Sequence, residues 1–170
     1  MGIRKIITLP DPVLRKKARK ITEFGPELQN LIDDMVETMR EAPGVGLAAP
    51  QIGVSSRLIV VEFGDDEDEE APRKLYVVLN PEIVRTDNET VSGVEGCLSI
   101  PQLVGNVERF ESVTVRGLNR RGQPLKIKAR GWLARIFQHE IDHLDGVLFV
   151  DRTDEVWKVE EDAAQVAPVE

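Results

Sequence analysis

Residues 131–146 read GWLARIFQHEIDHLDG. Gly131 interrupts an extended pattern, and the apolar periodicity after it predicts a helix over residues 132–145. Within this helix His139 and His143 lie one turn apart on nearly the same face. They are the two histidines of the chain. The stretch therefore predicts a helix that offers both imidazoles to one metal ion.

Glu140 completes a His-Glu-x-x-His pattern between these histidines. At the border of the same helix face, its carboxylate can reach a metal-bound water and act as a general base. Isolated histidines are more often plain core or surface residues. The shared spacing of His139 and His143 around a glutamate favours the metal site over that alternative.

A third ligand is needed, because catalytic metal sites usually have three protein ligands and one position for water. No further histidine remains, so the candidates are Asp142, Asp145 and Asp151 near the helix, or Cys97 elsewhere in the chain. A thiolate binds divalent iron or zinc strongly. A lone cysteine is more often a small buried residue. The preceding Gly96, which lets the backbone approach closely, favours a ligand role for Cys97.

Residues 44–53, GVGLAAPQIG, form a loop of small residues. The loop matches neither of the usual glycine-rich phosphate-binding patterns. Gln51 is its one long polar side chain, and its amide can donate a hydrogen bond to a developing oxyanion. A turn with a solvated glutamine explains the stretch equally well.

The remaining pattern indicates an α+β fold, with antiparallel and mixed β-sheets around the central His-Glu-x-x-His helix and an N-terminal helix. An apolar stripe of helical period predicts the N-terminal helix over residues 26–41. The acidic block 64–70 predicts a solvated loop. Short β-branched or alternating runs predict strands at 57–63, 75–79, 113–118, 125–129 and 147–150.

The length suits one domain, expected over residues 1–152, followed by an acidic tail over 153–170 that starts as a short helix. The 170 residues hold 22 basic and 30 acidic side chains, a net charge of −8. That balance argues against nucleic acid or an anionic membrane as a partner. The single cysteine excludes an internal disulfide and, with no signal-peptide pattern, favours the cytoplasm.

Three segments, GVGLAAPQIG at 44–53, EGCLS at 95–99 and QHEIDH at 138–143, together resemble the signature motifs of the peptide deformylase family. The likeness extends over roughly residues 3–152. It implies that Cys97, His139 and His143 bind one divalent metal ion. Fe²⁺ is the metal that the resemblance implies in the cell, and Zn²⁺, Ni²⁺ or Co²⁺ can occupy the same site.

The resemblance also implies the reaction, removal of the formyl group from the N-terminal formylmethionine of newly made polypeptides with release of formate. Metal-bound hydroxide attacks the formyl carbon, and Glu140 serves as general acid/base. Gln51 and the backbone N–H of Leu98 hold the carbonyl oxygen. Two alternatives stay open: a zinc metallopeptidase with the same helix motif, and a non-catalytic metal- or peptide-binding module.

Substrate contacts are expected from shape. Gly44 and Gly46 are expected to let the chain fit tightly around the small formyl group, and Trp132 and Ile136 fall on the metal-facing side of the helix. With Val45 they are expected to form the apolar slot for the methionine side chain, although plain core packing explains Trp132 and Ile136 equally well. Residues 101–106 lack the arginine that many members carry there.

The expected partners are formylmethionyl nascent peptides, with transient proximity to the ribosome. Some family members dock on the ribosome through a basic C-terminal helix. After Arg152 this chain has Lys158 as its one basic residue. That way of docking is therefore not expected here.

Overall fold

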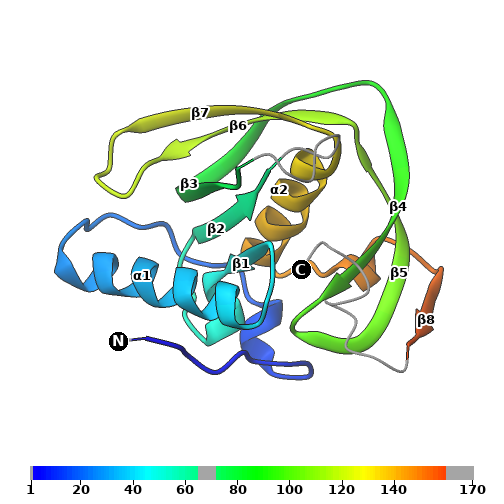
Figure 1. Cartoon of the computed structure of the whole chain (residues 1–170), viewed down its shortest axis with the longest axis horizontal. Helices are drawn as coiled ribbons and strands as arrows, with labels where there is room; N and C mark the ends of the chain where they lie inside the picture. Colours follow the sequence, from blue (N-terminus) through cyan, green and yellow to red (C-terminus); the bar gives the residue numbers. More distant parts are fainter. Residues whose placement is uncertain (1, 65–71, 160–170) are drawn as a thin grey trace.

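Two antiparallel sheets and two α-helices build the described part of the chain, residues 2–64 and 72–159 of the computed structural model (Figure 1). The helices are α1 (Pro26–Glu41) and α2 (Gly131–Leu144). The larger sheet has the order β1-β2-β3-β6-β7, formed by Gly46–Ala48, Leu58–Phe63, Lys74–Thr86, Ser112–Leu118 and Pro124–Arg130. The smaller sheet has the order β4-β5-β8, formed by Thr90–Cys97, Ile100–Phe110 and Val156–Lys158.

Helix α1 covers one face of the larger sheet at its β1–β2–β3 end (Figure 1). Its bounds confirm the predicted helix, with Pro26 in the first turn, where the missing N–H costs little. Its apolar stripe is fully buried at Ile32, Met35 and Met39. These side chains belong to one cluster with alternate residues of the sheet, Leu58, Val60 and Leu79.

Helix α2 packs on the opposite face of the same sheet and contacts β5 of the smaller sheet as well. Residues that alternate with the α1-facing ones, such as Ile59 and Val78, pack against its Ile136 and Phe137. This two-sided environment explains why α2 is buried on almost every face, from Ala134 to Leu144. The structure confirms the α+β class and the central helix. The strand pairs in both sheets are antiparallel, and a parallel bridge links Arg19 and Ser56.

The long hairpin of β4 and β5 was not predicted. Its strands run side by side from the pair Thr90–Phe110 to the pair Gly96–Val104, and the register shifts at Cys97. Many of its side chains are exposed or polar, so no clean alternation of apolar residues marks it in the sequence. The hairpin nevertheless positions Cys97 at its closed end.

Two expectations near the C-terminus are wrong. Residues 147–150 form no strand; instead Phe149–Asp151 is a short 3₁₀-helix, because Leu148 and Phe149 turn inward into the cluster that contains Cys97. The segment after it begins with the strand β8 on the edge of β5 rather than with a helix.

Several sequence-based expectations concern parts that the structure does not test. Most of the predicted acidic loop, from residue 65 onward, and the tail beyond residue 159 lie outside the described residues. The division into a domain over 1–152 and a tail over 153–170 stays a prediction. No described helix is long and apolar enough to cross a membrane.

Phe137 provides a test of this packing, because its ring is fully buried and meets Tyr76 edge-on at 5.4 Å between centroids. We expect Phe137→Ala to lower the free energy of unfolding by about 3–5 kcal/mol through lost burial and a cavity. Phe137→Leu should fall between this variant and the wild type. Phe110→Ala, at a ring position that is 39% exposed, should cost under about 1 kcal/mol. Equal losses in urea titrations of Phe137→Ala and Phe110→Ala would contradict the packing.

Candidate active site

Three buried ligand atoms meet where the end of β4 faces α2. They belong to Cys97, His139 and His143, and all lie within 4.8 Å of one another. The Cys97 Sγ is 3.4 Å from Nε2 of His143, and the two imidazole centroids are 5.1 Å apart. One sulfur and two nitrogens at these separations match three corners of a tetrahedral metal site.

The acidic alternatives for the third ligand are engaged elsewhere. Each of the three pairs with arginine: Asp142 with Arg109 and Arg152, Asp145 with Arg57, and Asp151 with Arg15. Cys97 is thus the member of the candidate set that stands beside the histidines.

The residues at this centre fit a divalent cation. Nε2 of His139 is buried and has no hydrogen-bond partner within the described residues, so an ion would satisfy it. Burial lowers the pKa of His143 well below its usual value, which keeps its imidazole neutral, the form that binds metal. The combination of thiolate and imidazole suits iron and zinc rather than magnesium or calcium.

Glu95 orients the first of these histidines. Its Oε1 lies 2.9 Å from Nδ1 of His139, which directs the other ring nitrogen towards Cys97 and His143. The carboxylate is fully buried. Burial by itself would raise the pKa of Glu95, but hydrogen bonds from Arg109 and His139 and their charges hold it well below its usual value. Glu95 therefore stays ionised beside His139.

Two arginines donate hydrogen bonds to Glu95, and a chain of ion pairs leads from one of them to a half-exposed arginine. Arg109 donates to both of its oxygens at 2.8 and 2.9 Å, and Arg135 donates to one at 2.7 Å. Arg109 also reaches Asp142 at 2.7 Å, and the half-exposed Arg152 holds both oxygens of Asp142. We call Glu95, Arg109, Arg135, Asp142 and Arg152 the buried charge network.

The sequence indicates Asp142 only as a possible metal ligand, and it predicts no role for the other four residues of this network. A signal existed for two members. Glu95 is two residues before Cys97 and thus on the same face of a strand, and Arg135 is one helical turn before His139. Arg109 comes from the unpredicted strand β5, and no sequence spacing indicated it.

Glu140 is fully buried beside the metal ligands, and neither of its oxygens has a hydrogen-bond partner within the described residues. Burial raises its pKa to about 7. A carboxyl with that pKa can both accept and release a proton near neutrality. A Cβ on Gly46 would stand 2.6 Å from Oε2 of Glu140, so glycine is needed at 46 for this side chain to fit.

Gln51 is held from both ends of its amide. The backbone N–H of Ala48 donates to Oε1 at 2.9 Å, which points Nε2 away from β1. Nε2 then lies 3.6 Å from the Cys97 Sγ and 3.2 Å from the Ser99 Oγ. The fully buried Gln51 is therefore a fixed donor at the metal site, and the alternative of a solvated glutamine is wrong.

The expected substrate-contacting residues lie in the apolar core beside the site. Val45 and Ile136 are buried in the cluster around α2, and Trp132 packs against it with the Arg135 guanidinium 5.2 Å from its ring. Trp132 is seven residues, or about 10 Å along the helix, from His139. The Leu98 side chain packs in the α1 cluster, which leaves its backbone next to Cys97. These contacts agree with core packing as well as with a substrate pocket.

Comparison with known proteins supports the interpretation of the site. A family model described as polypeptide deformylase matches residues 3–158. The chain is 51% identical over 161 residues to a peptide deformylase from Natranaerobius thermophilus, covering 95% of this chain and 99% of that one. The crystal structure of the Thermotoga maritima peptide deformylase is similar, with a TM-score of 0.83, 42% identity and coverage of 91% of this chain and 99% of that chain. An Acinetobacter baumannii deformylase with Met-Ala-Ser bound has a TM-score of 0.82 at 38% identity, over 89% of this chain and 98% of that one.

A helix carrying His-Glu-x-x-His beside a strand-borne cysteine defines a metal-binding hydrolase with a mixed sulfur and nitrogen ligand set. Identity of about half the residues to peptide deformylases over nearly the whole chain then makes the assignment specific. The chain belongs to the peptide deformylase family. It removes the N-formyl group from nascent peptides.

Glu95→Gln tests the orienting contact. The amide keeps the shape but loses the charge that holds Nδ1–H of His139, so we expect metal affinity to fall about 10- to 100-fold. Competition with a chromogenic chelator measures the affinity, and circular dichroism establishes that the variant is folded. Glu108→Gln, at an exposed glutamate of β5, is the matched control and should leave affinity unchanged. Unchanged affinity in folded Glu95→Gln would refute the orienting role.

Proposed function

We propose that Cys97, His139 and His143 hold the catalytic metal ion and that Glu140 is the general acid/base of deformylation. The observation that carries this proposal is the fully buried Glu140 carboxyl, which follows the candidate ligand His139 on α2 and whose oxygens have no hydrogen-bond partner within the described residues. A divalent ion at this site supplies Lewis-acid chemistry, lowering the pKa of water and polarising a carbonyl.

Glu140 handles the protons of the reaction in this proposal. The carboxylate takes a proton from the water that attacks the formyl carbon. The same group then gives that proton to the departing amine, which releases formate and a free N-terminus. Its pKa of about 7 suits both directions, because the acid and base forms are then of similar free energy at neutral pH.

Gln51 and the Leu98 backbone N–H stabilise the oxyanion that forms on the formyl oxygen. The amide of Gln51 is fixed by Ala48 before substrate arrives, so little reorganisation is needed. Gly46 contributes space rather than a contact, because a side chain there would displace Glu140.

The methionine side chain of the substrate occupies an apolar pocket formed by Val45, Trp132 and Ile136 beside Gly46. Support comes from their shared position in the apolar cluster around α2. The Acinetobacter baumannii relative was solved with Met-Ala-Ser bound, a peptide with methionine at its N-terminus. Formylmethionyl peptides are therefore the proposed substrates.

Fe²⁺ is the proposed metal in the cell, with Zn²⁺, Ni²⁺ and Co²⁺ as alternatives that the same ligands accept. The proposed location is the cytoplasm, where a single reduced cysteine can serve as a ligand. Transient proximity to the ribosome follows from the nascent state of the substrate.

Glu140→Gln separates catalysis from metal binding. The variant should retain its metal, because the three ligands are unchanged, and should release formate from a formyl-Met peptide about 100- to 10,000-fold more slowly. Gln51→Ala should cost about 100- to 1000-fold in kcat through the lost oxyanion donor. Metal content is measured on the same samples. Near-wild-type formate release by metal-loaded Glu140→Gln would overturn the proposed role.

The metal proposal predicts a difference in lifetime in air. A ferrous thiolate site is prone to oxidation, and Cys97 itself can be oxidised. Activity of protein reconstituted with Fe²⁺ should decay faster in air or peroxide than that of Ni²⁺- or Zn²⁺-loaded protein. Mass spectrometry of Cys97 and time courses of formate release measure this. Equal decay for all three metals would count against it.

A further inference from the structure

One half of the larger sheet has a strongly basic outer face. Strand β7 presents Lys126, Lys128 and Arg130 at alternate positions, which places all three on one face of the sheet. Arg116 of β6 stands opposite Lys126, and Arg85 of β3 stands opposite Thr114, the partner of Lys128. We call these five exposed cations the basic face.

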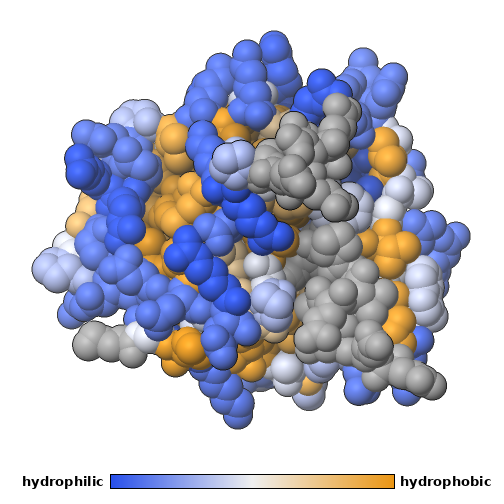
Figure 2. Space-filling view, in the orientation of Figure 1, coloured by the Kyte–Doolittle hydropathy of each residue, from blue (hydrophilic) through white to orange (hydrophobic). Residues whose placement is uncertain are grey.

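The basic face is open because α1 covers only the other half of the same side. Leu79 and Leu118, which lie on this side of the sheet, pack in the α1 cluster. The intervening residues of β6 and β7, such as Val115 and Ile127, point to the α2 side. In the view of Figure 2 hydrophilic residues form the rim of the region where the β6–β7 hairpin lies, with hydrophobic residues inside this rim.

The cations of the basic face are not neutralised internally. None of the five forms an ion pair within residues 2–64 and 72–159. The ion pairs found there are formed by other arginines and, in one case, by His139. Glu82 stands opposite Arg116 in the register, and Asp87 lies at the edge, where it accepts a hydrogen bond from Ser112. Within the described residues these two acids are the ones placed against the five cations by strand register or at the sheet edge, in a chain of net charge −8.

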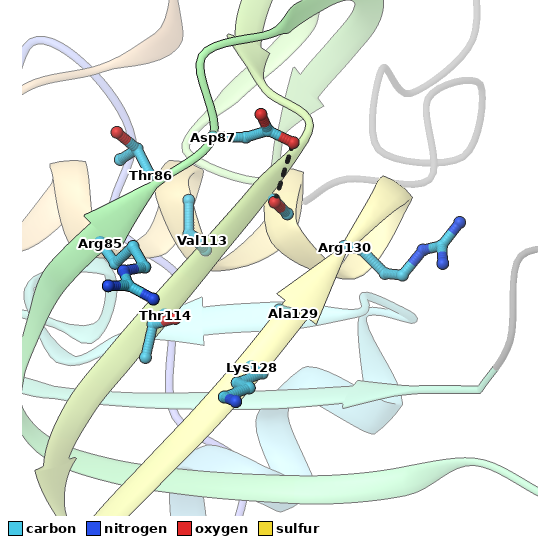
Figure 3. Close-up of a pocket in the computed structure, with 9 residues that line it drawn as sticks. Arg85, Thr86, Asp87, Val113, Thr114, Lys128, Ala129 and Arg130 are labelled. Carbon is cyan, nitrogen blue, oxygen red and sulfur yellow. Dashed lines mark hydrogen bonds between the residues drawn. The ribbon is translucent and has the colours of Figure 1, made fainter.

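A shallow hollow of about 340 Å³ lies within the basic face. Figure 3 shows Arg85, Thr114 and Lys128 beside one another on β3, β6 and β7, with Arg130 extending from the end of β7. The hollow is also lined by the Asp87 carboxylate, which accepts a hydrogen bond from Ser112. The cations and hydroxyl groups around it are the groups that contact phosphate oxygens in nucleic-acid complexes.

We propose that the basic face binds the phosphate backbone of RNA. Charge complementarity carries the proposal: alternate residues on a strand are about 7 Å apart and neighbouring strands about 5 Å apart, so each cation can meet a different phosphate. RNA is the polyanion that this enzyme encounters, because its substrates are nascent peptides made on an assembly rich in RNA. The net charge of the whole chain argues against general nucleic-acid binding, but the local charge is of the opposite sign.

The position of the basic face is compatible with the activity. Helix α2, which carries His139 and His143, packs on the opposite side of the sheet. RNA bound on the outer side would therefore leave the metal site accessible to a peptide. The proposal is independent of the residue roles in deformylation, so either can fail without the other.

Fluorescence anisotropy with a labelled RNA hairpin tests the proposal on the full-length, metal-loaded enzyme. With five contacts, the affinity of the wild type should fall about 100- to 500-fold between 50 and 200 mM KCl. The triple variant Lys126→Gln, Lys128→Gln, Arg130→Gln should bind at least about 10-fold more weakly at 50 mM KCl. Its dependence on salt should shrink to about 10-fold over the same range, because two contacts remain.

The matched control is Lys16→Gln, Lys17→Gln, Lys20→Gln, which removes the same charge from the exposed N-terminal basic stretch. This control should bind RNA within about 2-fold of the wild type, and both triple variants should release formate from a short formyl-Met peptide at the wild-type rate. Equal loss of binding in the two triple variants would overturn the proposal, as would absent or salt-independent binding by the wild type. Binding to phosphatidylglycerol vesicles but not to the RNA hairpin would also overturn it.

Discussion

The hydrogen bond between Glu95 and His139 is the contact on which the rest of the active site depends. It fixes the imidazole ring, so that the opposite nitrogen is aimed at Cys97 and His143. A carboxylate can remain charged in a fully buried position only if cations surround it, and Arg109 and Arg135 fulfil that need. The hairpin of β4 and β5 brings Glu95 and Arg109 onto α2, which carries Arg135 and His139, and this explains why a separate small sheet packs beside the helix.

Buried ion pairs of this kind are poor sources of stability, because desolvation offsets most of the attraction. Here the ion pairs hold Glu95 in place, and Glu95 sets the orientation of the His139 ring. Apolar residues of equal volume would fill the space between the hairpin and α2 but could not orient a ring nitrogen. The chain thus takes its stability from the clusters on both faces of the larger sheet and uses the buried charge network to position a ligand.

How far the sequence predicted the structure differs between elements. Helices α1 and α2 repeat their apolar residues at helical period, so their bounds were predicted within one residue. The pairing of Cys97 with His139 and His143 was among the alternatives, and the resemblance to a family favoured it. The β4–β5 hairpin was missed because its exposed and polar residues follow no simple period. Arg109, which arrives on that hairpin, could not be assigned from a local pattern, because its partners are distant in the chain.

The ligands Cys97 and His143 are separated by 46 residues, and one lies on each of the two packed layers. An ion bound by both residues would link the two ends of this long loop. The link restricts the unfolded chain more than the folded one, so it would stabilise the folded state. Occupancy of the site is therefore linked to the cohesion of the whole molecule. The supply of the bound metal ion in the cell would in this way set how long the protein survives as well as how fast it works.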